Sequence, residues 1–99
     1  MEYICNRLLV VGSKRLVKQF TRSRWERILV AKHIEIIENS PGRYINQFDT
    51  AAPLVEPLRV LSRRWKKLVF LLAWEWEDKR LKGVVKAKAG LFDSCRVEY

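Results

Sequence analysis

Hydrophobic and polar positions alternate most regularly between residues 68 and 77. Five large apolar side chains occupy one set of alternate positions there: Leu68, Phe70, Leu72, Trp74 and Trp76. Residues two apart share one face of a strand, so this segment predicts a β-strand with a buried face. The opposite face becomes acidic at Glu75 and Glu77. Burial of that second face is therefore expected to fade towards the end of the strand.

Similar but shorter patterns predict five further strands. Turn-forming residues separate them, above all the segment Asn39-Ser40-Pro41-Gly42, where Pro presets a turn dihedral and Gly tolerates positive φ. A turn there joins two strands into a hairpin. The five predicted strands cover residues 3–11, 33–38, 43–50, 81–89 and 92–99.

Apolar residues at helical spacing predict two helices. Ser13 is a suitable N-cap for the first, which presents Leu16, Val17 and Phe20 on one stripe. Trp25 and the apolar residues after it either extend this helix or form a separate turn, and the pattern over residues 21–32 leaves both open. Pro57 suits the first turn of the second helix. The inward stripe of that helix is formed by Leu58, Leu61 and Trp65.

The order of elements is strand, helix, hairpin, helix and then antiparallel strands. It predicts one α+β domain over residues 1–99, a two-layer sandwich with a mainly antiparallel sheet and two helices on one face. The split βαβ pattern of the ferredoxin-like fold accommodates this order. We expect Phe70 and Leu72 to pack against Leu16, Phe20, Leu58, Leu61 and Trp65.

Two segments carry a resemblance to a known family. Cys5-Asn6-Arg7-Leu8, followed by Val10-Val11-Gly12, resembles the opening of the YubB-type ferredoxin-like domain family of plasmids and phages, with Ile4 in place of the family's tryptophan. Phe48-Asp49-Thr50-Ala51, Pro57, Leu61-Ser62 and Lys82-Gly83 resemble its second half, with Ala52 in place of another tryptophan. The resemblance implies a ferredoxin-like fold and origin in a mobile element. It implies no established enzymatic activity.

The formal net charge is +9, from 20 basic and 11 acidic residues. Clustered cations attract polyanions or acidic protein surfaces, although part of such a cluster is an ordinary solvated surface. Cations near the end of the second helix also complement its dipole. The residues predicted to bind a partner are those on the two helices and just after them: Lys14, Arg15, Lys18, Arg22, Arg59, Arg63, Arg64, Lys66 and Lys67.

Residues with catalytic or metal-binding chemistry are sparse. His33 is the only histidine, and Cys5 and Cys95 lie far apart in the sequence, so we expect no enzyme activity, no cofactor and no metal site. The cysteines are expected to be half-buried thiols, or a disulfide if the end strands are neighbours. Glu75 and Glu77 are expected to pair with lysines across a hairpin. No apolar run reaches membrane-spanning length, so we expect no insertion into a membrane. The N-terminus shows no signal-peptide pattern, which favours a cytoplasmic protein.

The leading hypothesis is a small, basic, non-enzymatic binding module that contacts nucleic acid through the positive faces of its helices. The alternative is a protein-interaction or inhibitory factor of the phage type, acting on host machinery. Such a factor would bind an acidic protein surface or form a homodimer through a sheet edge. The residues alone do not separate these two classes of partner.

Overall fold

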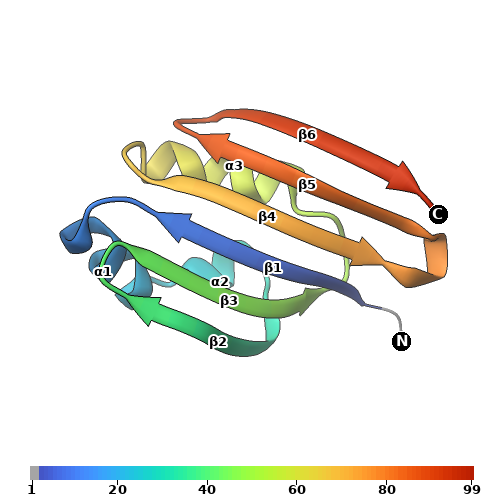
Figure 1. The fold of residues 1–99 in the computed structure, drawn as a ribbon, viewed down its shortest axis with the longest axis horizontal. Helices are drawn as coiled ribbons and strands as arrows, with labels where there is room; N and C mark the ends of the chain where they lie inside the picture. The colour runs from blue at the N-terminus through green and yellow to red at the C-terminus, as the bar shows by residue number, and fades with distance from the viewer. Residues whose placement is uncertain (1–2) are drawn as a thin grey trace.

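The computed structural model describes residues 3–99 and shows an α+β fold, in which a six-stranded antiparallel sheet is covered on one face by helices (Figure 1). The strand order is β2-β3-β1-β4-β5-β6, and every neighbouring pair is antiparallel. The predicted α+β class with a mainly antiparallel sheet is confirmed. The sheet has two strands more than the four of a ferredoxin-like unit. The strands are β1 (Ile4–Val11), β2 (Lys32–Ser40), β3 (Arg43–Thr50), β4 (Val69–Trp76), β5 (Leu81–Lys88) and β6 (Leu91–Glu98).

The helical layer contains three α-helices, so the prediction of two was wrong. They are α1 (Lys14–Arg22), α2 (Trp25–Ile28) and α3 (Val55–Arg64), and a short 3-10 turn, η1 (Glu77–Lys79), follows β4. As predicted, the Ser13 hydroxyl caps α1 by accepting a hydrogen bond from the Leu16 amide at 3.2 Å. No helix within residues 3–99 combines the length and the apolar character that crossing a membrane requires.

The break between α1 and α2 has a physical cause in the core. Ser23 ends α1 in an extended conformation, and its hydroxyl and amide both bond to the Phe20 carbonyl. This turn directs Trp25 inwards, where only 3% of it stays exposed and its ring stacks on Phe20 at 5.9 Å between centroids. Burying two large aromatic rings against the same part of the sheet therefore outweighs continuation of one helix.

Phe20 lies at the centre of the core. Its ring contacts four other aromatic rings, with centroid distances of 5.5 to 6.3 Å, and none of it is exposed. Phe70 and Leu72 of β4 are buried in the same cluster with Leu58 and Leu61 of α3, as predicted. The four rings around Phe20 belong to Trp25, Tyr44, Trp65 and Phe70.

The opposite face of the sheet, here called the open face, is covered by no helix (Figure 1). In the central strands, the side chains that point to the helices are buried and the alternate ones are half-buried or exposed. Cys5 lies on β1 and Cys95 on β6, with β4 and β5 between them. Both thiols are free and exposed. The expectation of half-buried cysteines was therefore wrong, and the end strands are not neighbours.

Candidate functional site

The first group of predicted partner-binding residues lies along α1. Lys14, Arg15, Lys18 and Arg22 are all exposed, on the side of the helix away from the buried Val17 and Phe20. Lys14, Lys18 and Arg22 also border a hollow between α1 and the turn from β2 to β3. These side chains make no ion pair among the described residues. Four positive charges thus remain available on one helix surface.

A second group meets in a groove between α2 and the end of α3. Arg24 and Arg27 approach it from the α2 segment, and Arg64 approaches it from α3. All three arginines are exposed, whereas the aromatic residues beneath them are buried or half-buried. The groove has a volume of about 380 Å³, and its remaining lining is formed by Ser23, Trp25, Ile28 and Trp65. We call it the arginine groove.

The arginine groove includes two residues that the sequence reasoning did not select. Arg24 and Arg27 lie in the segment whose conformation was left open, so their direction could not be inferred. The signal that was available is charge: between Ser13 and Lys32, Glu26 is the only acidic residue. Because α2 is a separate helix, Arg24 and Arg27 lie beside the same groove as Arg64.

Arg59 and Arg63 point to a different part of the molecule. Arg59 pairs with Glu56 at 3.2 Å, and its guanidinium lies 4.4 Å from the ring centroid of Phe92 on β6. Arg63 packs against Gly90 in the turn between β5 and β6, where a Cβ atom would lie 2.7 Å from the Arg63 side chain. Both arginines therefore help to hold α3 on the β5–β6 hairpin, and Arg59 is partly neutralised.

Lys66 and Lys67 lie in the turn after α3 rather than on the helix. This turn passes beside Gly12, because a Cβ on Gly12 would lie 3.5 Å from the Lys67 carbonyl oxygen. The Gly12 amide also donates a hydrogen bond to the Gly42 carbonyl at 3.2 Å. The two lysines thus extend positive charge to the end of the sheet where α1 begins.

The nine predicted residues do not form one continuous patch. We use the name basic helix layer for the cations that face away from the sheet on α1 and around the arginine groove. Arg22 and Arg24 are two residues apart and connect these two parts. The basic helix layer consists of Lys14, Arg15, Lys18, Arg22, Arg24, Arg27 and Arg64.

Other residues whose side chains could take part in catalysis, metal binding or stacking are dispersed over the molecule. The Nδ1 atom of His33 lies 2.9 Å from a carboxylate oxygen of Asp49; the His33 side chain is exposed and the Asp49 side chain is half-buried. Within residues 3–99, no three His, Cys, Asp or Glu side chains gather in a way that could hold a metal ion. Trp74 is half-buried and lies against Gly83 on the helix side of the sheet. Its ring packs against Gly83, and Trp74 also borders a depression on the other face of the sheet.

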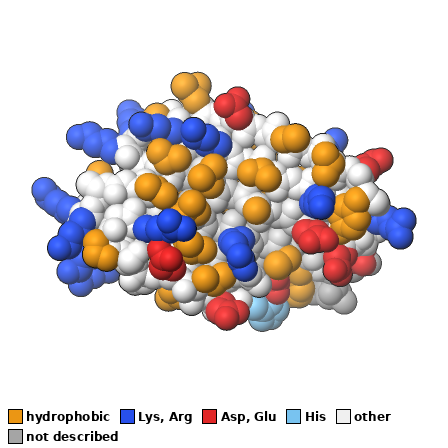
Figure 2. Space-filling model, viewed as in Figure 1, with side chains coloured by type: hydrophobic (Ala, Val, Ile, Leu, Met, Phe, Trp, Pro, Cys, Tyr) orange, Lys and Arg blue, Asp and Glu red, His pale blue; other side chains and the backbone are white. Residues whose placement is uncertain are grey.

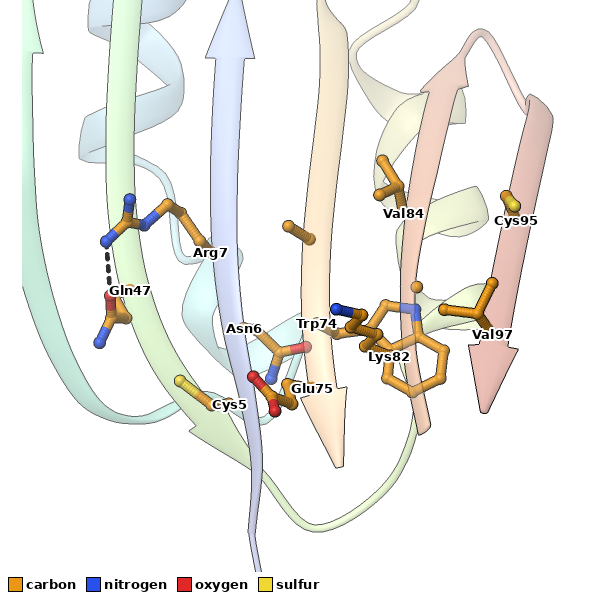
Figure 3. Close-up of a pocket in the computed structure, with 12 residues that line it drawn as sticks. Cys5, Asn6, Arg7, Gln47, Trp74, Glu75, Lys82, Val84, Cys95 and Val97 are labelled. Atoms are coloured by element: carbon orange, nitrogen blue, oxygen red, sulfur yellow. Dashed lines mark hydrogen bonds between the residues drawn. The ribbon is translucent and has the colours of Figure 1, made fainter. Parts of the chain in front are cut away.

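The open face carries a shallow depression of about 470 Å³ around Ala73 (Figure 3). Arg7 and Gln47 border it and are joined by a hydrogen bond of 3.1 Å from the guanidinium to the amide oxygen. Cys5, which also borders the depression, has a thiol whose pKa is raised, first by partial desolvation beside the neighbouring strands and then by the charges of Asp49 and Glu75.

Tyr99 provides a prediction that concerns pH. Its hydroxyl donates a hydrogen bond to a Glu75 carboxylate oxygen, and this bond raises the pKa of Tyr99 to about 12. Lys82 is opposite Glu75 in the sheet register, but Tyr99 is the hydrogen-bonding partner of that carboxylate. Replacing Glu75 with alanine should lower the pKa of Tyr99 towards its ordinary value of 10.

Ultraviolet absorbance of the phenolate, recorded against pH, measures this change. The variant Tyr99→Phe identifies which transition belongs to Tyr99. Glu77→Ala is the matched control and should change that pKa much less, because Glu77 acts on Tyr99 only through its charge. A Tyr99 that titrates near its ordinary value in the unsubstituted protein would contradict the hydrogen bond.

In comparisons with protein-family models, with curated proteins and with solved structures, none matches this chain.

Proposed function

We propose that this protein is a non-enzymatic module that binds nucleic acid through the phosphate groups, using the basic helix layer. The observation that carries the proposal is the arginine groove, where three exposed guanidinium groups from two helices border one concave surface. Guanidinium groups bind phosphate oxygens in a bidentate manner and remain charged at every physiological pH. The four cations of α1 continue this surface.

The aromatic floor of the groove supports the same proposal. Trp65 is half-buried, and its ring packs edge-on against Phe20 at 5.5 Å between centroids. The three arginines therefore surround aromatic rings that are held rigidly by packing, which reduces the conformational entropy lost on binding. Phosphate contacts of this kind fix position and supply affinity without reading sequence. Binding should accordingly depend little on base sequence.

We also propose that the fold is a ferredoxin-like unit extended by one hairpin. The first four strands have the order β2-β3-β1-β4, and the helices follow β1 and β3 in the chain. This order is that of a ferredoxin-like unit, to which the hairpin of β5 and β6 adds two strands. We therefore propose membership of the YubB-type family, origin in a mobile element and a place in the cytoplasm.

A salt titration tests the proposed function. Fluorescence anisotropy would be recorded with labelled single-stranded and duplex DNA of mixed sequence, and with RNA of the same length. If all seven cations contact phosphates of a duplex, the slope of log K against log salt approaches about −6. Absence of binding to all three at low salt, or binding that is insensitive to salt, would overturn the proposal.

The alternative of an acidic protein partner uses the same groove. Carboxylates also pair with guanidinium groups in a bidentate manner. The two partners are distinguished by competition: heparin and DNA should both displace labelled DNA if phosphate or sulfate density is recognised. If the protein binds none of these polyanions but binds an acidic protein through Arg24 and Arg64, the partner is an acidic protein rather than a nucleic acid.

A further inference from the structure

The strand β6 forms a regular outer edge of the sheet. No strand of residues 3–99 lies beyond it, and Figure 1 shows it along the margin of the molecule. It pairs with β5 over its whole length, Leu91–Glu98, without a register shift. The other edge strand, β2, has two register shifts, and His33 within it has a φ of +56°. Irregularities of this kind hinder further strand pairing, whereas a regular edge is open to it.

The backbone groups on the outer side of β6 follow from its pairing with β5. The Tyr99 amide donates a hydrogen bond to the Arg80 carbonyl at 2.9 Å. Since backbone groups alternate in direction along a strand, every second residue from Tyr99 back to Leu91 bonds to β5. The residues between them direct their amides and carbonyls outwards, where another extended strand can bind. These residues are Phe92, Ser94, Arg96 and Glu98.

We infer that β6 binds β6 of a second copy of this chain, antiparallel, about a two-fold axis perpendicular to the sheet. The axis passes between the two copies of Ser94, so Phe92 lies opposite the partner's Arg96. Each of these pairs exchanges backbone hydrogen bonds, because all of their outer amides and carbonyls point across the axis. The two sheets become one continuous sheet, with both helical layers on the same side.

Apolar side chains at the edge make this register self-complementary. Leu91 is 80% exposed and lies opposite the partner's Val97, which is 47% exposed, and the axis repeats this pair at the other end of the contact. Figure 2 shows hydrophobic and charged side chains mixed along the margin where β6 lies. Lys88 is beside Leu91 on β5, and Lys82 is beside Val97. The apolar pair therefore separates these two lysines of different copies.

An ion pair joins the copies beyond each apolar pair. The same register brings Glu98 beside the partner's Gly90, in the turn between β5 and β6. The Arg63 side chain occupies the space beside Gly90, since a Cβ there would lie 2.8 Å from the Arg63 Nε atom. Glu98 shares the helix side of β6 with Phe92, over which the Arg59 guanidinium lies. Glu98 therefore meets the guanidinium of the partner's Arg63 in a charge-assisted contact.

The remaining charges near the contact are balanced within each copy. The two Asp93 carboxylates are diagonal neighbours across the axis, but each lies beside Lys86 of its own chain. Arg59, which is near the partner's Arg96, is already paired with Glu56 at 3.2 Å. The basic helix layer lies away from the contact, because α1 packs on β3 and three strands separate β3 from β6. The inference therefore does not depend on the proposed function.

Neighbouring registers are less favourable. A shift by one step towards the end of β6 places Glu98 on the partner's Phe92 and Asp93 on the partner's Val97. Both carboxylates would then lie on apolar side chains, and the two copies of Arg96 would become diagonal neighbours. A shift in the other direction places Asp93 opposite the partner's Asp93, which is repulsive.

The mass of the protein in solution tests the contact. Light scattering after size exclusion, over a series of concentrations, should give twice the monomer mass of 11.8 kDa. Ser94→Pro removes an outward amide at the axis and leaves the hydrogen bonds to β5 in place. It should raise the dissociation constant of the dimer at least about tenfold. Ser94→Ala keeps this amide and is the matched control, and circular dichroism verifies that both variants fold.

A cysteine pair tests the register. In a Cys5→Ser background, Asp93→Cys places a thiol opposite the partner's Cys95, at a pair without backbone hydrogen bonds, where side chains are closest. Oxidation with copper phenanthroline should link this variant into a covalent dimer at least about tenfold faster than the Cys5→Ser protein, in which Cys95 has no thiol directly opposite. Glu98→Arg should weaken the dimer, because it meets the partner's Arg63.

Three results would overturn the inference. A monomer at every concentration, or a dimer that Ser94→Pro leaves intact, would exclude the contact through β6. Equally fast linking through Cys95 alone would exclude this register. A dimer strengthened by Glu98→Arg would exclude the ion pair with Arg63 and, with it, the register that this pair supports.

Discussion

Replacing Phe20 with alanine is expected to lower the free energy of unfolding by about 3–5 kcal/mol, near the upper end of that range. Phe20 is fully buried and contacts four aromatic rings that belong to α2, β3, β4 and the end of α3. Its removal leaves a cavity that these rigid rings cannot fill by small movements. Domains of this size have a total stability of only about 5–15 kcal/mol, so the loss is a large share of it.

Chemical denaturation followed by tryptophan fluorescence measures this loss. Phe20→Leu retains part of the volume and should cost less than the alanine variant. Val60→Ala, at an exposed position of α3, should change stability by no more than about 0.5 kcal/mol. If Phe20→Ala were as stable as Val60→Ala, the aromatic core would not be organised around Phe20.

Reversing two charges of the arginine groove, Arg24→Glu together with Arg64→Glu, is expected to weaken nucleic-acid binding about 100-fold. The estimate follows from losing two charge-assisted hydrogen bonds to phosphate, each contributing at least about 1.4 kcal/mol, and the added repulsion increases it. Thermal stability should remain nearly unchanged, because both side chains are exposed.

The control for this prediction changes the net charge equally at another place. Lys79→Glu with Arg96→Glu reverses two exposed cations on η1 and β6, away from the groove. It should weaken binding only slightly, since it lowers the overall attraction but removes no phosphate contact. Equal losses in the two double variants would mean that binding depends on net charge alone and that the groove has no special role.

Local patterns in the sequence were sufficient to predict most of the elements. Strict alternation predicted β4, and Asn39-Ser40-Pro41-Gly42 predicted the hairpin of β2 and β3, because both signals depend on neighbouring residues alone. The Ser13 cap and the apolar stripe predicted where α1 begins. The excess of basic residues on the helices is likewise a property of composition, so seven of the nine selected residues do lie on helices.

What the sequence could not provide is the relation between distant segments. Whether Trp25 continues α1 or turns into the core depends on whether its ring can stack on Phe20 against β3, a long-range contact. That same turn brings Arg24 and Arg27 to Arg64 and forms the groove. Arg59 and Arg63 were separated from the groove for the same kind of reason, since α3 packs on the β5–β6 hairpin.

The sequence by itself therefore determined the α+β class, the positions of the strands and the strongly basic surface, because periodicity and charge are local. Only the tertiary structure decided which cations meet, which tyrosine pairs with Glu75 and which face of the sheet has no covering. With all three helices on one side, the apolar residues on the other side of β1, β3 and β4 remain accessible. Period-two alternation places residues on two faces, but only packing determines which face is buried.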